Sequence, residues 1–367
     1  MTKLSDKVIK VLIVDDSAFM RKALSMMLES DPHIKIIGTA RDGEEGIAKV
    51  KELKPDLVTM DIEMPRMDGL TALRKIMSDN PLPVMMVSSL TTDGAGATLD
   101  ALELGAVDFI PKQLSYVSLD IIKIKEELLE KIKNIARRKN ILMAKYRTNV
   151  FKSFNKSNSQ NKSKKTSSIF QNNISKRNHI VSVIALGTST GGPLALQSVV
   201  PNLPRNIPVG MLIAQHMPAA FTSALAERLN KMSQVTVKEA ENGDKVEAGN
   251  VYIAPGGKQM TVKKVGVNKN ITISDKPDDV LYKPCVDIMM KSVADVYGGT
   301  TLGVIMTGMG YDGLIGLKEV KARGGVIIAQ DEETCIVYGM PKAVVDADIA
   351  DYISPLDEIA SGITSFF

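Results

Sequence analysis

The chain has 367 residues, of which 44% are hydrophobic and 24% are charged, and its formal net charge is +4. This length suits two domains of ordinary size better than one, and the composition is that of a globular protein. No apolar run approaches the roughly 20 residues of a membrane span, and the first residues do not resemble a signal peptide. Because Cys285 and Cys335 also lack metal-ligand spacing, we expect a reduced, cytoplasmic protein without membrane insertion.

A basic, polar segment divides the chain. No Asp or Glu occurs between Glu130 and Glu227, and residues 152–168 are rich in Ser, Asn and Lys without helical or strand periodicity. Such a composition cannot bury enough apolar surface to order itself, so we predict a linker at 136–179 between domains at 1–135 and 180–367. The alternative is a nucleic-acid-binding arm, but aromatic side chains that could stack on bases are sparse there. We therefore expect no nucleic acid as a partner.

Strand patterns alternate with helical patterns five times in the first domain. The helical pattern at 17–29 is amphipathic and has, on or near one face, Ala18, Met20, Leu24, Met27 and Leu28. The predicted strands are Val8–Val14, Ile34–Gly38, Asp56–Met60, Pro83–Val87 and Ala106–Ile110. Five such units predict a doubly wound, flavodoxin-like α/β domain whose parallel strands have the order 2-1-3-4-5.

Three carboxylates follow two strands that should be neighbours in this sheet. Asp15 and Asp16 end the first strand, and Asp61 ends the third. Carboxylates this close repel one another unless a cation compensates, and oxygen ligands suit Mg²⁺. Ser88 and Lys112 follow the last two strands and could hold phosphoryl oxygens while a carboxylate attacks phosphorus. The alternative is that the acidic residues only cap helices.

This domain resembles the response-regulator receiver family. The matching stretches are Leu12–Arg21, Met60–Gly69 and Met86–Leu90. The resemblance implies phosphorylation of Asp61 by a chemotaxis histidine kinase, with Asp15, Asp16 and Asp61 holding Mg²⁺. It also implies that Ser88 and Lys112 contact the phosphoryl group, with Phe109 as the switch aromatic. One departure concerns proline, which usually follows the family's lysine; here Pro111 precedes Lys112, and Gln113 follows it.

In the second domain, three apolar runs each end at a residue type used in nucleophilic catalysis. Ser189, His216 and Asp312 follow, in this order, the runs Val181–Leu186, Val209–Ala214 and Thr301–Met306. Short β-branched runs of this kind predict buried parallel strands in a second doubly wound α/β domain with a mostly parallel sheet. Because sites form at the carboxyl ends of such strands, we expect the three residues to meet as nucleophile, base and orienting carboxylate.

The surroundings of the serine and the histidine sharpen this expectation. Gly187–Gly191 fits the pattern Gly-x-Ser-x-Gly before a helical pattern at Pro193–Val200, so an oxyanion could be stabilised by backbone N–H groups, first that of Thr190. A Gly-rich turn or phosphate cradle is the alternative. Of the three histidines, only His216 follows a buried strand of this domain. The near-neutral pKa of an imidazole suits a general base, and the alternative is that His216 has only a structural role.

Two other functions compete with a hydrolase. Gly308–Gly313 also fits Gly-x-Gly-x-x-Gly after a strand, and Asp331 follows the next strand, which is the outline of a dinucleotide-binding unit in a nicotinamide enzyme. That hypothesis leaves Ser189 and His216 without a role. The second alternative is a catalytically inactive regulator that binds a partner, although all three catalytic positions are filled.

Residues 180–364 resemble the chemotaxis protein-glutamate methylesterase family. The matching segments are Ala185–Gly192, Gln215–Pro218, Tyr252–Gly256, Met306–Gly313, Gln330–Cys335 and Tyr338–Pro341. The resemblance implies a monomeric enzyme, regulated by phosphorylation and without an esterase cofactor, that hydrolyses glutamate γ-methyl esters on chemoreceptors and deamidates certain receptor glutamines. It implies Ser189 as nucleophile, His216 as acid/base and Asp312 as orienting carboxylate. Oxyanion or substrate contacts would come from Thr190, Met309 and Gly310, while Cys285 stands where the family often has serine and is expected to be structural.

Overall fold

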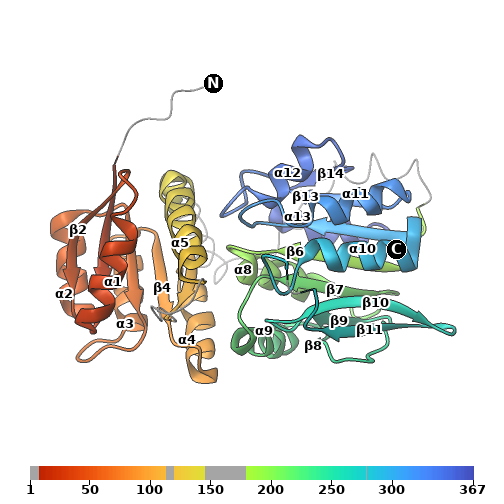
Figure 1. Cartoon of the computed structure of the whole chain (residues 1–367), viewed down its shortest axis with the longest axis horizontal. Coiled ribbons are helices and arrows are strands. Elements are labelled where there is room, and N and C mark those ends of the chain that lie inside the picture. The colour runs from red at the N-terminus through yellow and green to blue at the C-terminus, as the bar shows by residue number, and fades with distance from the viewer. Residues whose placement is uncertain (1–7, 113–119, 145–178, 278) are drawn as a thin grey trace, which may run out of the picture. The chain divides into compact units, whose positions relative to one another are not determined.

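The protein is described by a computed structural model that covers residues 8–112, 120–144, 179–277 and 279–367. It forms two compact units, Met1–Lys162 and Ser163–Phe367, each of which has its own sheet. No helix among these residues is both long and apolar enough to span a bilayer. Figure 1 labels the helices and strands.

A five-stranded parallel sheet forms the centre of the first unit. Its order is β2-β1-β3-β4-β5, as predicted, so the ends of β1 and β3 are neighbours. The strands are β1 (Ile9–Val14), β2 (Ile34–Ala40), β3 (Leu57–Asp61), β4 (Val84–Ser88) and β5 (Asp108–Pro111). Each lies within two residues of its predicted position, and the fold class is confirmed.

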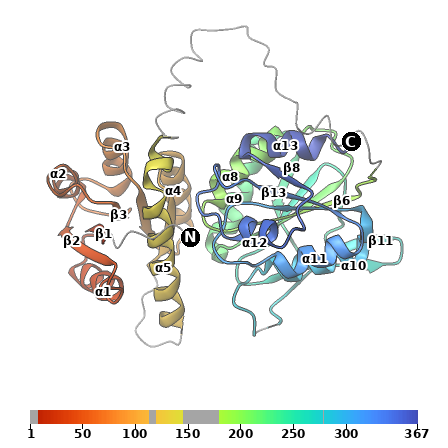
Figure 2. The ribbon, with the colours of Figure 1, turned by 90° about the horizontal axis from the view of Figure 1, so that it is seen from above.

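Helices cover both faces of this sheet, as Figure 2 shows for α1 on one side and α2 and α3 on the other. They are α1 (Ala18–Leu28), α2 (Gly43–Leu53), α3 (Gly69–Asp79), α4 (Thr92–Glu103) and α5 (Asp120–Arg137). The first four begin where a side-chain oxygen accepts a backbone N–H, which satisfies one of the free donors at a helix start. These capping residues are Ser17, Asp42, Asp68 and Thr91.

Two details differ from the sequence analysis. Ala18 is exposed, and Ala23 takes its place on the buried face of α1, because Ala18 lies at the first helical position beside the cap. Residues 136–137 and 139–144, part of the segment expected to be linker, are also helical. Met143 is buried there, and Nζ of Lys139 donates to the backbone oxygen of Pro55 across 2.8 Å. The rest of that segment, up to residue 178, lies outside the described residues.

The second unit contains a seven-stranded sheet in which every pairing is parallel. Its order is β14-β13-β12-β6-β7-β9-β8, which confirms the expected class of fold. The strands are β6 (Val183–Thr188), β7 (Gly210–Gln215), β8 (Thr236–Glu239), β9 (Asn250–Ile253), β12 (Thr301–Ile305), β13 (Val326–Gln330) and β14 (Tyr352–Ser354). An antiparallel hairpin of β10 (Gln259–Val265) and β11 (Asn268–Ser274) is inserted after β9.

Helices again pack on both faces of the sheet. One group comprises α8 (Gly192–Val199), α9 (Ala219–Met232) and α13 (Leu356–Thr364), and the other comprises α10 (Val286–Tyr297), α11 (Leu314–Ala322) and α12 (Met340–Asp346). Figure 2 shows the two groups on opposite sides of the strands. Short 3₁₀ turns at Val200–Asn202 and Gly298–Thr300 complete the unit. The topology places β6 centrally, between β12 and β7, so the residues after these three strands share one edge.

Candidate functional site

Adjacent strands carry the serine and the histidine to the same edge. The last pair of the β6–β7 ladder is Thr188 with Gln215, so Ser189 and His216 leave the sheet side by side. The backbone N–H of His216 donates to the oxygen of Thr188 across 3.2 Å. The buried side-chain amide of Gln215 donates to the backbone oxygens of both Ser189, at 3.0 Å, and His216, at 3.1 Å. Gln215 therefore holds the two loops together, a role that the sequence analysis missed.

The turn at Ser189 is tight enough to require glycine. Gly191 has a φ of 76°, in the left-handed region, and a Cβ there would lie 2.7 Å from the side chain of Ile336. A Cβ on Gly192 would lie 1.9 Å from Oε1 of Gln215. The N–H of Ser189 donates to the oxygen of Thr307 across 3.0 Å. The turn is thus pinned to both neighbouring strands, which places Ser189 at the start of α8.

Asp312, which follows β12, lies at the same edge of the sheet and contacts His216. Its Oδ2 lies 2.8 Å from Nε2 of His216 and accepts the backbone N–H of Val286 at 2.7 Å. Its Oδ1 accepts the N–H of Asp287 at 2.9 Å and lies 3.3 Å from Sγ of Cys285. Burial by itself would raise the pKa of Asp312, but hydrogen bonds from His216 and from the start of α10 outweigh it and lower the pKa to about 2. Asp312 is therefore a carboxylate at neutral pH.

The histidine ring has one nitrogen engaged and one available. With Nε2 on Asp312, Nδ1 is buried and has no hydrogen-bond partner among the described residues. The hydroxyl of Thr190 is likewise buried without a partner in that part of the chain. A neutral imidazole that donates through Nε2 accepts a proton through Nδ1. Nδ1 is therefore the ring nitrogen left available, and no hydrogen bond between Ser189 and His216 is among the described contacts.

The loop after β12 closes the other side of the serine. A Cβ on Gly308 would lie 2.9 Å from Cβ of Ser189, so this loop touches the serine and carries Met309 and Gly310 past it. The buried hydroxyl of Thr307 donates to the oxygen of Thr190 across 2.9 Å. The N–H of Thr307 donates to Oε1 of Gln330 across 2.8 Å. Both residues lie in segments that resemble the methylesterase family, but nothing in the sequence indicated that Thr307 contacts Thr190 and Gln330.

Cys285 is buried beside the same carboxylate. Burial and the neighbouring charge of Asp312 raise the pKa of its thiol to about 12. A nucleophilic cysteine needs a thiolate, so this environment supports the expected structural role.

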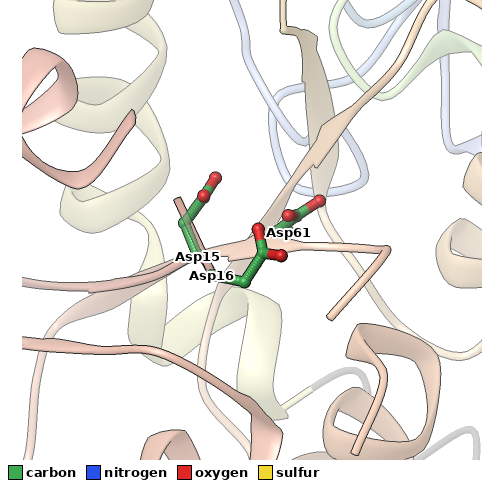
Figure 3. A group of neighbouring side chains, drawn as sticks. All are labelled: Asp15, Asp16 and Asp61. Atoms are coloured by element: carbon green, nitrogen blue, oxygen red, sulfur yellow. The ribbon is translucent and has the colours of Figure 1, made fainter. Parts of the chain in front are cut away.

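The three carboxylates of the first unit also meet. Asp15, Asp16 and Asp61 lie at the ends of β1 and β3, and each offers an oxygen within 4.8 Å of the others (Figure 3). Burial raises the pKa of Asp61 to about 6, although Nζ of Lys112 lies only 2.6 Å from its Oδ2. Oδ2 of Asp15 is buried with no partner among the described residues. An electron-rich, partly unsatisfied oxygen cluster of this kind fits a hard divalent cation.

Ser88 and Phe109, the other predicted contacts, are both buried. The hydroxyl of Ser88 accepts from Thr98 of α4 across 2.7 Å, so it is engaged with α4 in this structure. Lys112 reaches Asp61 even though Pro111 precedes it, because its N–H pairs with the oxygen of Ser88 across 2.8 Å and extends the β4–β5 ladder. Gln113 lies outside the described residues.

Comparison with known proteins agrees with both units. A family described as response regulator receiver domain matches residues 11–121, and one described as CheB methylesterase matches residues 184–363. A protein-glutamate methylesterase/protein-glutamine glutaminase of Nitratidesulfovibrio vulgaris is 50% identical over 97% of this chain and 98% of its own length. The chain belongs to this methylesterase/glutaminase family. It is a phosphorylation-regulated enzyme of chemotactic adaptation, with a receiver domain before its hydrolase domain.

Two further relatives extend this assignment. The methylesterase/glutaminase of Lawsonia intracellularis is 47% identical over 97% of this chain and 98% of its own length. The catalytic domain of the Thermotoga maritima CheB methylesterase is 41% identical, with a TM-score of 0.50, and covers 51% of this chain and 99% of its own. Membership of the family leaves the dinucleotide hypothesis without support. Asp331, its ribose-binding candidate, accepts instead from the N–H of Thr334 at 2.8 Å.

Proposed function

We propose that Ser189 is the nucleophile of this methylesterase, His216 its general acid/base and Asp312 the carboxylate that orients the imidazole. The observation that carries this assignment is the contact of 2.8 Å between Nε2 of His216 and Oδ2 of Asp312, at the strand edge where the Ser189 turn also lies. Catalytic hydrogen bonds to a nucleophile are often loose without substrate. The geometry therefore suits a serine hydrolase whose histidine uses Nδ1 toward the serine.

The substrates that we propose are glutamate γ-methyl esters and certain glutamines on the cytoplasmic parts of chemoreceptors. Oγ of Ser189 attacks the side-chain carbonyl carbon while Nδ1 of His216 takes the hydroxyl proton. The imidazolium then returns that proton to the leaving group, which departs as methanol from the ester or as ammonia from the amide. Water attacks the glutamyl-enzyme with the same proton transfers, and glutamate is released from Ser189.

The tetrahedral intermediates carry an oxyanion that needs donors. We propose the backbone N–H of Thr190, together with Met309 and Gly310, as oxyanion or substrate contacts. Their support is position: Thr190 follows the nucleophile at the start of α8, and the Gly308 loop lies against Ser189. Donors aimed at developing charge typically contribute about 3 kcal/mol to transition-state stabilisation. This half of the enzyme needs no cofactor for the steps above.

For the receiver, we propose Asp61 as the acceptor of a phosphoryl group from a chemotaxis histidine kinase. Asp15, Asp16 and Asp61 would hold Mg²⁺, which when bound neutralises the charge of the phosphoryl oxygens. Lys112 already contacts Asp61 and would pair with the new phosphate. Ser88 would turn from Thr98 toward the phosphate, and Phe109 would act as the switch aromatic.

The remaining assignments concern the whole chain. We propose a monomer that acts in the cytoplasm, where buried thiols outside disulfides, such as those of Cys285 and Cys335, persist. We keep the proposed domains at 1–135 and 180–367, with a basic linker at 136–179 whose first residues continue helix α5. Neither nucleic acid nor a membrane is proposed as a partner.

Methanol release from membranes that hold methylated chemoreceptors tests the proposed function. We expect the full chain to release methanol and the Ser189→Ala variant to release almost none. A binding regulator would release none in either form, and a nicotinamide enzyme would instead be stabilised by NAD or NADP. Release by Ser189→Ala at the parental rate would overturn the assignment of the nucleophile.

A further inference from the structure

An aromatic ring lies flat against the histidine. The rings of Tyr282 and His216 are stacked, with centroids 4.1 Å apart and planes inclined by 13°. The imidazole is 8% exposed, whereas Tyr282 is only half-buried, so its ring forms a cover over one face of the imidazole. Stacked rings at this separation attract each other beyond the effect of area burial.

A single buried side chain contacts the backbone of both Tyr282 and Cys285. Gln259, at the start of β10, is fully buried. Its Nε2 donates to the oxygen of Tyr282 across 3.0 Å, and its Oε1 accepts the N–H of Cys285 across 2.8 Å. The oxygen of Lys283 accepts the N–H of Gly257 across 2.9 Å. Tyr282 is therefore held in place through its backbone.

The same short segment also supports the carboxylate. Directly after Cys285, the N–H groups of Val286 and Asp287 donate to Asp312, which contacts Nε2 of His216. Residues 282–287 thus contact the histidine twice, through the ring of Tyr282 and through Asp312. A shift of this segment would disturb both contacts together.

The two contacts constrain different motions of the imidazole. The Cβ–Cγ bond and the contact with Asp312 hold the ring at Cγ and Nε2. Rotation about the line through these atoms remains, and it swings Nδ1 out of position because Nδ1 lies off that line. A flat ring against one face opposes this rotation. The electron-rich face of tyrosine also favours the imidazolium that forms during proton transfer.

We propose that Tyr282 is a positioning residue for the esterase reaction: its ring keeps Nδ1 of His216 aimed at Ser189. This inference rests on the proposed role of His216 as acid/base. It assigns the effect to the ring face and not to the phenol hydroxyl. Tyr282→Phe should therefore preserve function, whereas Tyr282→Leu removes the flat π face and keeps apolar bulk.

Steady-state kinetics of the full chain test this proposal. We expect kcat of Tyr282→Leu to fall roughly tenfold with KM within about twofold, since substrate binding is kept and proton transfer is impaired. Tyr282→Phe should stay within about threefold of the parent in kcat. Tyr352→Leu is the matched control, because Tyr352 of β14 packs edge-on against Phe366 and not on the histidine. That variant should leave both constants unchanged.

Proton NMR of His216 detects the stacking of the two rings independently of the kinetics. The chain has only three histidines, so His216→Ala identifies the ring signals of His216. The ring current of Tyr282 should shift these signals upfield in the parent and in Tyr282→Phe, and the shift should disappear in Tyr282→Leu. A parental kcat in Tyr282→Leu, or equal losses in the Phe and Leu variants, would overturn the positioning role. Retained activity in His216→Ala would instead overturn the proposed function itself.

Discussion

His216 contacts Asp312 through Nε2, at 2.8 Å, and its other nitrogen, Nδ1, is buried without a partner among the described residues. In the mechanism that we propose, the carboxylate therefore contacts Nε2 and the serine uses Nδ1. The same mechanism predicts what each substitution removes. Loss of Ser189 or His216 removes a reacting group, whereas loss of the Asp312 charge weakens orientation and the stabilisation of the imidazolium.

The first prediction concerns these three residues. Ser189→Ala and His216→Ala should each lower kcat for methanol release by at least about 10³-fold, and the double variant should lose little more, because the groups act as a unit. Asp312→Asn should keep a larger remnant. Methanol release from methylated receptor membranes measures all four variants. Losses that multiply in the double variant would show that the two residues act independently.

The second prediction is that the thiol of Cys285 takes no part in the reaction. Because burial and Asp312 keep Cys285 protonated, Cys285→Ser should retain activity within about threefold, with the hydroxyl donating to Oδ1 of Asp312 in place of the thiol. Cys285→Ala should be less stable by about 1 kcal/mol, because a buried donor is lost. Kinetics and thermal unfolding of the two variants measure this. Complete loss of activity in Cys285→Ser would assign the sulfur a chemical role.

The third prediction concerns phosphorylation. Incubation with a small acyl phosphate and Mg²⁺ should label the full chain, and Asp61→Asn or removal of Mg²⁺ by a chelator should abolish the label. Ser189→Ala is the matched control and should be labelled at the parental rate, since it lies in the other unit. Unchanged labelling of Asp61→Asn would place the acceptor elsewhere.

The fourth prediction links the charge of Asp61 to stability. Its pKa rises from 3.8 to about 6 on folding, so the folded receiver binds more protons than the unfolded chain between these values. Ionised Asp61 therefore lowers the free energy of unfolding of the receiver. This loss is absent below pH 4, grows between pH 4 and pH 6, and is complete above pH 6. Without Mg²⁺, Asp61→Asn should stabilise the receiver by up to about 3 kcal/mol at pH 7 and by almost nothing near pH 4.

Calorimetry at the two pH values measures this difference. The transition of the receiver is the one that Mg²⁺ shifts upward in the parent, because a ligand of the folded state raises its unfolding temperature. Lys112→Met serves as a contrast, since loss of its ammonium removes a stabilising partner of Asp61 and should destabilise the receiver at pH 7. A larger gain for Asp61→Asn at pH 4 than at pH 7 would contradict the argument.

The fifth prediction concerns regulation. Methanol release by the full chain should rise several-fold on addition of acyl phosphate and Mg²⁺, because phosphorylation shifts the receiver toward a state that permits activity. Asp61→Asn should remain at the basal rate. Thr98→Val should respond at lower concentrations of phosphodonor, since Ser88 then loses the hydrogen bond that it accepts from Thr98 and, among the described contacts, is held to α4 only through the oxygen of Gly94. Equal responses of the parent and Asp61→Asn would separate regulation from Asp61.

The sequence alone was sufficient for the parallel sheets, the order of the receiver strands, and the strand ends that carry Asp15, Asp61, Ser189, His216 and Asp312. Short apolar runs bounded by glycine are local signals, and parallel strands necessarily bring their carboxyl ends to one edge. The residues that meet at each edge therefore follow from the order of motifs along the chain.

Only the tertiary structure decided how the side chains at these edges are held. Tyr282 and Gln259 come from the segment around the β10–β11 hairpin, and no local pattern links them to His216, which follows β7. The same holds for Gln215, whose amide bridges two loops, and for the choice of Nε2 over Nδ1 toward Asp312. Side-chain orientation depends on contacts between residues distant in sequence, and those contacts exist only once the chain has folded.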